Sequence, residues 1–291
     1  MLKADTARNR LLGIGLVSVT FACFAVLDTT AKWLVRTLPV LEVVWLRFVG
    51  HVLFTGLLLA PRHGRALLRT TRPGLQGVRG VMLFAMTALN FWALQYLQLA
   101  ETAAIQFAVP LLVALFGAWL LGERLDAGRW AAIGLGFVGV LLIVRPGTGA
   151  FHPAILLAIG NAVLYALFNL LTRRLAATDR PESTQFLSAL AAATLLAPFA
   201  IAAWRTPATG LEWVLLALLG IAGGTGHWLL AVAHRFAPAS VLAPCLYQQI
   251  VWMTLLGWWV FGDVPGWAVV AGTAVVVASG LYLIARERTG P

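Results

Sequence analysis

Charged side chains are scarce in this sequence. Only 11% of its 291 residues are charged, whereas 60% are hydrophobic. A soluble globular domain carries roughly 25% charged residues, because its surface must face water. The shortage of charge therefore excludes an ordinary soluble domain and predicts a polytopic membrane protein.

Cysteine and catalytic motifs are also scarce. The two cysteines, Cys23 and Cys245, lie within apolar runs, which gives neither a disulfide framework nor a metal-binding spacing. The sequence lacks the H-E-x-x-H and G-x-S-x-G motifs, and its five histidines are scattered. A membrane-embedded enzyme, such as a lipid-modifying transferase, needs a nucleophile with a base or a metal cluster. We therefore predict no catalytic residue, no metal and no cofactor, and the enzyme is the less favoured alternative.

The net charge of +10 raises the question of nucleic acid binding. The basic residues lie in short segments between apolar runs, with no basic domain or tail. Membrane orientation accounts for that distribution better. The predicted partners are the lipid bilayer and a small-molecule substrate, without nucleic acid, and we expect the protein to function as a monomer.

Long apolar runs, in contrast, are abundant. A membrane-spanning helix needs about 20 predominantly apolar residues. By that rule the sequence predicts ten spans, at 11–34, 39–60, 78–97, 100–121, 128–145, 152–172, 184–204, 211–234, 238–261 and 266–285. The connections are short, so no segment outside the bilayer is large enough for a soluble active site.

The basic residues predict the orientation, because cytoplasmic loops retain Lys and Arg. We predict that the protein lies in the inner membrane of the cell with both termini in the cytoplasm. In that orientation the cytoplasmic side carries sixteen Lys and Arg residues. The outer side carries four, namely Lys32, Arg36, Arg145 and Arg205. This bias supports an even number of spans.

The two halves of the chain, 1–147 and 148–291, share a layout of five spans. Span 4 ends in "WLLGERL" (Trp119–Leu125) and span 9 in "WWVFGDV" (Trp258–Val264). Because five is odd, the second half is inserted upside down. The predicted fold is therefore all-α, with ten transmembrane helices arranged as two inverted five-helix repeats around a central cavity, and the substrate site lies near the midplane.

The ten spans, the "GERL" closing span 4 and Pro110 within it resemble an EamA-type exporter of the drug/metabolite transporter superfamily. The chain is most similar to bacterial exporters of aromatic and other hydrophobic amino acids. This resemblance implies export by alternating access around a central cavity, with other metabolites, nucleosides or cationic compounds as alternative cargo. Arg47 matches an arginine early in span 2, and Gly122 and Glu123 match the Gly-Glu pair.

The second half departs from this pattern at its proline. Pro110 precedes Glu123 by thirteen positions, whereas the residue thirteen positions before Asp263 is Ile250. The nearest proline is Pro244, about one and a half helical turns earlier. Both prolines predict helix breaks, because proline removes one backbone donor and frees the carbonyl four residues back.

Two adjacent glutamines lie near the predicted midplane of span 9. A lipid-facing amide there would cost several kcal/mol, so both must face protein or water. In a regular helix Gln248 shares a face with Pro244 and Trp252, whereas Gln249 shares one with Cys245. We favour Gln248 as the cavity residue and Gln249 as a helix–helix contact, and the opposite assignment stays open.

Other polar or amphipathic side chains at similar depth predict a polar, uncharged pocket. Amides and hydroxyls bind the charged groups of a zwitterion, and indole faces suit an aromatic ring or a cation. For each residue alone, an interfacial or packing role is the simpler interpretation. The candidates, besides Gln248, are Asn90, Trp92, Gln106, Asn161, Tyr165, Asn169, His227, Trp228, Tyr247 and Trp252.

Charges inside spans are rarer and mark functional sites more often. Asp28 and Lys32 share one face of span 1, while Glu42 and Arg47 lie near the start of span 2. Structural ion pairing is the simpler interpretation, and an outer gate or proton-linked switch is the sharper hypothesis. Two glycine patterns, Gly134–Gly139 and Gly220–Gly224, predict close helix packing rather than a dinucleotide site, because no strand precedes them.

Overall fold

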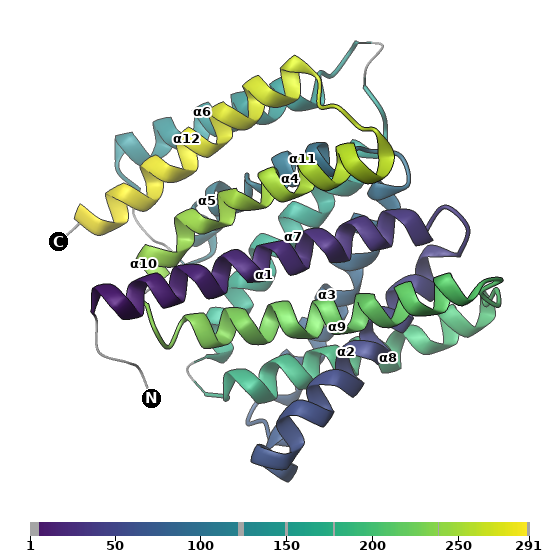
Figure 1. Ribbon diagram of the computed structural model, residues 1–291. Coiled ribbons are helices and arrows are strands. Elements are labelled where there is room, and N and C mark those ends of the chain that lie inside the picture. The colour runs from purple at the N-terminus through teal and green to yellow at the C-terminus, as the bar shows by residue number, and fades with distance from the viewer. Residues whose placement is uncertain (1–5, 122–124, 149–150, 177, 238, 290–291) are drawn as a thin grey trace.

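The computed structural model describes residues 6–121, 125–148, 151–176, 178–237 and 239–289, and these ranges are helical apart from turns and loops (Figure 1). Eight long helices run unbroken: α1 (Ala7–Leu34), α2 (Val40–His63), α3 (Pro73–Leu94), α6 (Ala127–Val144), α7 (Ile155–Leu175), α8 (Pro181–Ala202), α9 (Gly210–Ala233) and α12 (Trp267–Thr289). A short 3₁₀ helix, η1 (Gly64–Leu68), follows α2.

Two predicted spans are interrupted. Span 4 consists of α4 (Leu99–Gln106) and α5 (Val109–Leu121). Span 9 is divided into α10 (Ala239–Leu242), the 3₁₀ helix η2 (Ala243–Gln248), α11 (Gln249–Leu256) and the π-helical turn η3 (Gly257–Phe261). Among the described residues, nine segments are long and apolar enough to cross a membrane, and span 9, which is divided into short helices, is not one of them. The predicted all-α fold is confirmed.

The contacts between helices follow the two-repeat layout. The first helix of each half packs against the third helix of the other, α1 against α9 and α7 against α3. The second helices, α2 and α8, pack against each other, and so do the fifth helices, α6 and α12. The α2–α8 pair and the α6–α12 pair lie on opposite sides of the molecule (Figure 1). Helix α1 begins and α12 ends at the same end of the bundle (Figure 1).

Glycines permit the closest helix contacts. A Cβ atom on Gly220 of α9 would lie 2.5 Å from the Cα atom of Gly50 of α2, so the two backbones touch there. A Cβ atom on Gly139 of α6 would lie 2.8 Å from the backbone oxygen of Gly272 of α12. The predicted packing role of both glycine patterns is confirmed, although Gly134 borders open space. Gly122 and Glu123, which carried part of the resemblance, lie outside the described residues.

The loop between α7 and α8 is held by one carboxylate. Asp179 accepts hydrogen bonds from the hydroxyl of Thr70, from the backbone N–H of Thr71 at 3.0 Å and from Nε2 of Gln76 at 2.8 Å. Burial alone would raise the pKa of Asp179, but these hydrogen bonds together hold it well below its ordinary value. The carboxylate thereby ties the α7–α8 loop to the start of α3.

Candidate functional site

A cavity of about 680 Å³ lies between the two halves of the molecule. At one extreme its wall contains Asp28 of α1 and Arg47 of α2. At the other it contains Arg129 at the start of α6, Arg173 near the end of α7, and His234 after α9. The cavity therefore extends from the middle of the bundle to the end at which α1 begins.

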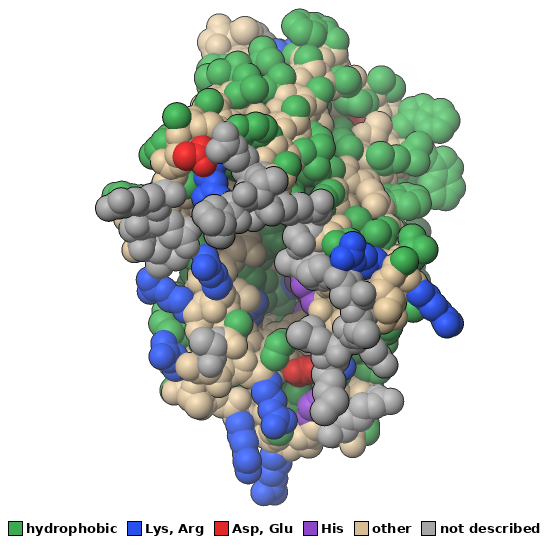
Figure 2. Space-filling view, turned by 90° about the vertical axis from the view of Figure 1, so that its left-hand side faces the viewer, with side chains coloured by type: hydrophobic (Ala, Val, Ile, Leu, Met, Phe, Trp, Pro, Cys, Tyr) green, Lys and Arg blue, Asp and Glu red, His purple; other side chains and the backbone are tan. Residues whose placement is uncertain are grey.

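We call this end the open end. Figure 2 looks onto it and shows a hollow in the surface, with Lys and Arg side chains gathered around it. Arg129 and Arg173 belong to this region and also line the cavity. These arginines are among the basic residues whose distribution predicts the cytoplasmic side. The structure thus relates the cavity opening to the predicted cytoplasmic face.

The opposite end, where α1 ends and α2 begins, is closed by contacts between the two halves. The Nζ atom of Lys32 lies 2.6 Å from Oδ2 of Asp263 and donates a hydrogen bond of 2.9 Å to the backbone oxygen of Leu97. The ring of Phe261 is contacted by the Lys32 ammonium at 4.9 Å and by the Arg36 guanidinium at 4.6 Å. We call this end the closed end, and the ion pair the Lys32–Asp263 bridge.

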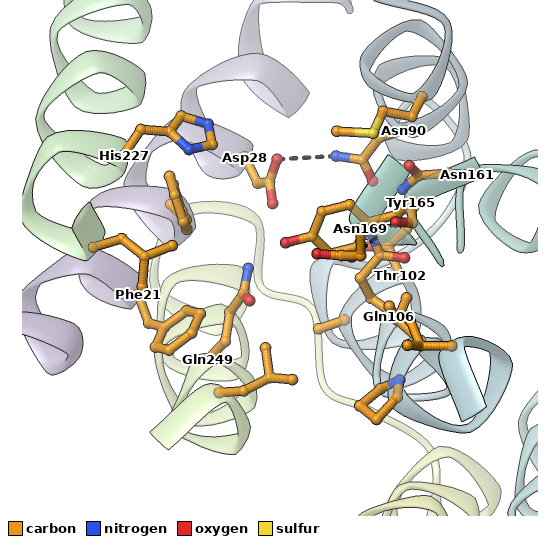
Figure 3. A pocket seen from close by; sticks show the side chains of 18 of the residues that line it. Phe21, Asp28, Asn90, Thr102, Gln106, Asn161, Tyr165, Asn169, His227 and Gln249 are labelled. Carbon is orange, nitrogen blue, oxygen red and sulfur yellow. Dashed lines mark hydrogen bonds between the residues drawn. The ribbon is translucent and has the colours of Figure 1, made fainter. Parts of the chain in front are cut away.

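One side of the cavity is rich in hydrogen-bonding groups from α3, α4 and α7 (Figure 3). The Nδ2 atom of Asn90 donates to Oδ1 of Asp28 at 3.0 Å, and Nδ2 of Asn169 donates to the backbone oxygen of Tyr165 at 2.8 Å. The Oε1 atom of Gln106 has no partner among the described residues. We call this side the polar wall; it comprises Asn90, Thr102, Gln106, Asn161, Tyr165 and Asn169.

The facing side is aromatic. Phe21 and Phe24 of α1 pack edge to face with centroids 6.3 Å apart, and Phe24 packs against His227 of α9 at 5.0 Å. Figure 3 shows Phe21 and His227 across the cavity from the polar wall, with Gln249 of α11 pointing into the space between them. We call Phe21, Phe24 and His227 the aromatic wall.

The helix break in span 4 faces this cavity. Helix α4 ends at Gln106 and α5 begins at Val109, immediately before Pro110. Both Gln106 and Pro110 line the cavity. Backbone groups freed from a helix at membrane depth persist only where protein or a wet cavity receives them, and here the break lies on the wall.

The two glutamines of span 9 are placed opposite to expectation, since Gln249 lines the cavity and Gln248 does not. The reason is the 3₁₀ helix η2, which runs from Ala243 to Gln248. A 3₁₀ helix turns by about 120° per residue and an α-helix by about 100°. Over the four residues from Pro244 to Gln248 this difference adds up to roughly 80°, which rotates the Gln248 side chain away from the face predicted for a regular α-helix. The prediction assumed a regular helix.

Several other candidates also lie outside the cavity wall. Tyr247 is buried between Phe107, at a centroid distance of 5.1 Å, and Gly280 of α12. Pro244 does not line the cavity. The three indole candidates lie away from it and are 36–39% exposed, as expected of lipid-facing side chains: Trp92, Trp228 and Trp252.

The charged candidates separate into two groups. Lys32 pairs with Asp263 rather than with Asp28, because the loop after η3 reaches the end of α1. Asp28 instead accepts a hydrogen bond from Asn90. Glu42 accepts a hydrogen bond of 2.9 Å from the backbone N–H of Arg205. Lys32 and Glu42 therefore stabilise the closed end, whereas Asp28 and Arg47 line the cavity.

Sequence reasoning missed the aromatic wall residues Phe21 and Phe24 and the polar wall residue Thr102. Phe21, Phe24 and Asp28 are spaced by three and four positions, so they share one face of α1. Because Asp28 is an intramembrane acid, the helical spacing from it would have identified Phe21 and Phe24 as residues on the same face. Thr102 gives no comparable signal in the sequence.

Comparison with known proteins shows that the EamA-like transporter family model matches residues 11–145 and 152–286. The chain belongs to the EamA-like transporter family. The family match covers both halves of the chain separately, in agreement with the two-repeat fold. The protein is thus a membrane transporter of small molecules rather than an enzyme.

Related transporters are named for different substrates. The chain is 27% identical over 288 residues to an S-adenosylmethionine uptake transporter of Rickettsia felis, covering 98% of this chain and 96% of that protein. It is 29% identical to a riboflavin transporter of Vibrio cholerae, covering 77% and 75%. It is 30% identical to a pseudopaline exporter of Pseudomonas aeruginosa, covering 95% and 96%.

A solved structure shares the fold. It aligns with a TM-score of 0.65 and 23% sequence identity, covering 98% of this chain and 100% of the other. At that identity the likeness concerns the fold alone.

Proposed function

We propose that this transporter carries amphipathic metabolites that join an aromatic or heteroaromatic ring to a polar chain, with aromatic amino acids as the smallest members. The observation that carries the proposal is the division of the cavity into a polar wall and an aromatic wall (Figure 3). A ring packs against Phe21 and Phe24, while the polar chain binds amides and hydroxyls opposite.

The size of the cavity agrees with this class. Pockets for drug-sized ligands have volumes of about 300–1,000 Å³, and this cavity measures about 680 Å³. An amino acid fits with room to spare, and so does a larger ring system with a polar chain.

The named substrates of the relatives support the same class. S-adenosylmethionine and riboflavin, named for two of these relatives, each join a flat heteroaromatic ring to a polar chain. Net export from the cell is the predicted direction, and the relatives include both uptake transporters and an exporter.

Transport proceeds by alternating access in the inner membrane, with the open end facing the cytoplasm. In this state ligand enters from the open end while the Lys32–Asp263 bridge keeps the closed end shut. Breaking the bridge and closing the open end would expose the same walls to the other side.

A counterflow panel in proteoliposomes tests the proposal. Purified protein is reconstituted, and uptake of labelled tryptophan, S-adenosylmethionine, riboflavin, a nucleoside and a cationic dye is measured with and without a pH gradient. We expect saturable uptake of ring ligands that are recovered chemically unchanged. Preference for the cationic dye, or turnover to a new product, would overturn the proposal.

A further inference from the structure

Arg47 is a buried cation whose donors are not used by the protein. Arg47 is 5% exposed, yet neither its Nε nor its Nη1 atom has a hydrogen-bond partner among the described residues. The ring of Phe48 lies 4.2 Å from its guanidinium carbon, and Gly223 of α9 presents no side chain on the facing helix. Buried donors without partners are costly, and an intramembrane charge is costlier still.

Among the described residues, the titratable groups that interact electrostatically with Arg47 come from α1, α2 and α9. Asp28 of α1 interacts with it electrostatically, but no hydrogen bond or ion pair joins the two in the described part of the chain. His51 of α2 and His227 of α9, with ring centroids 5.5 Å apart, are the others. Neither ring nitrogen of His51 has a partner among the described residues. This group of side chains, which we call the headgroup cluster, therefore has one acid and an excess of unused donors.

One carboxylate oxygen of Asp28 accepts a hydrogen bond from the protein, and the other accepts none among the described residues. Its Oδ1 accepts from Asn90 at 3.0 Å, and Figure 3 shows the side chain pointing into the space between the two walls. Asp28 and Arg47 both line the cavity. Opposite charges that interact without touching leave a gap that a molecule carrying both charges can enter.

We infer that the headgroup cluster is a subsite for the zwitterionic α-amino acid group of the substrate, in which Arg47 binds the carboxylate and Asp28 the ammonium. This inference rests on the proposed function and narrows it to ligands that join a ring to an α-amino acid headgroup. Guanidinium binds carboxylate through two parallel N–H donors, a pairing that lysine does not reproduce. The ring then extends toward the open end, between the polar and aromatic walls.

A ligand series on the wild-type protein tests the inference without any substitution. Tryptophan, tryptamine and indole-3-propionate share the same ring and chain; tryptamine lacks the carboxylate, and indole-3-propionate lacks the ammonium. Each competes against labelled tryptophan and labelled S-adenosylmethionine in proteoliposome counterflow. We expect each single deletion to weaken competition at least tenfold, and riboflavin, which has no such headgroup, to compete as weakly.

Two variants then assign the partners. Arg47→Gln should weaken competition by tryptophan at least tenfold but leave competition by tryptamine unchanged, because tryptamine has no carboxylate to lose. Asp28→Asn should weaken competition by tryptophan and tryptamine and leave indole-3-propionate unchanged. Arg79→Gln is the matched control: Arg79 is also buried, but it bonds to Ser188 Oγ at 2.6 Å and to Thr172 Oγ1 at 3.0 Å and does not line the cavity.

The outcomes separate the inference from the proposed function. If tryptamine or indole-3-propionate competes as well as tryptophan, or if riboflavin alone is carried, the headgroup subsite is wrong while transport of ring ligands stands. If Arg47→Gln weakens all three indoles equally, as Arg79→Gln would through the fold, the assignment of the carboxylate to Arg47 is wrong. If no ring ligand moves at all, the proposed function itself fails.

Discussion

At the residue scale, Gln249 and Gln248 offer a natural comparison, because they are adjacent and only Gln249 lines the cavity. Gln249→Leu removes an amide that points between the two walls (Figure 3). One lost hydrogen bond of about 1 kcal/mol corresponds to roughly a fivefold weaker affinity for the ring ligand. Counterflow KM should rise by about that factor in Gln249→Leu and stay unchanged in Gln248→Leu. Equal effects in the two variants would mean that neither amide contacts the ligand.

Asp179 gives a prediction about pH. A carboxyl whose pKa is lowered by folding stabilises the protein above its unfolded pKa, about 3.9, and this contribution is lost as the pH falls toward the folded pKa. Asp179→Asn should therefore destabilise the protein by about 2 kcal/mol at pH 7, the order of a hydrogen bond to a charged group. Thermal unfolding in detergent should show this difference shrinking below about pH 4. A difference independent of pH would contradict the role of the carboxylate charge.

At the scale of elements, the backbone contact between α2 and α9 fixes the position of Arg47 relative to α9. A Cβ atom on Gly220 would lie 2.6 Å from the carbonyl carbon of Gly50, which is backbone and cannot move aside. Gly220→Ala should lower the free energy of unfolding by about 1–3 kcal/mol. Gly134→Ala is the control, because nothing lies within 4 Å of its added Cβ atom. Equal unfolding temperatures for the two variants would contradict the close contact.

The spans were predictable from the sequence because apolar length is a local property. The predicted span 211–234 corresponds to α9 (Gly210–Ala233), and the span 128–145 to α6 (Ala127–Val144). The local geometry of span 9 was not predictable, because apolar length does not distinguish a 3₁₀ helix from an α-helix. The partner of Lys32 was not predictable either, since Asp263 lies 231 residues away and is brought near only by the packed halves.

At the scale of the whole molecule, the Lys32–Asp263 bridge joins the two halves at the closed end. Loss of an ion pair worth about 1 kcal/mol shifts a two-state equilibrium by roughly fivefold. Lys32→Gln and Asp263→Asn should each raise, by about that factor, the labelling of a cavity thiol by an impermeant maleimide applied from the closed end. The thiol is Asn169→Cys in a Cys23→Ser, Cys245→Ser background.

Exchange of the two charges provides the control. Lys32→Asp combined with Asp263→Lys should return labelling to the level of the parent protein, because the pair is restored in reverse. If the exchanged protein labels as fast as the single variants, the bridge does not hold the closed end shut.

Protection of the same thiol by ligand tests most directly whether the cavity is the transport site. In proteoliposomes carrying Asn169→Cys, maleimide labelling from the open end and counterflow of tryptophan and S-adenosylmethionine are measured over the same range of ligand concentrations. The polar wall predicts that each transported ligand half-protects the thiol at the concentration that half-saturates its counterflow, while Leu68→Cys, exposed outside the cavity, stays unprotected. Saturated counterflow with the thiol at position 169 still fully labelled would contradict the account.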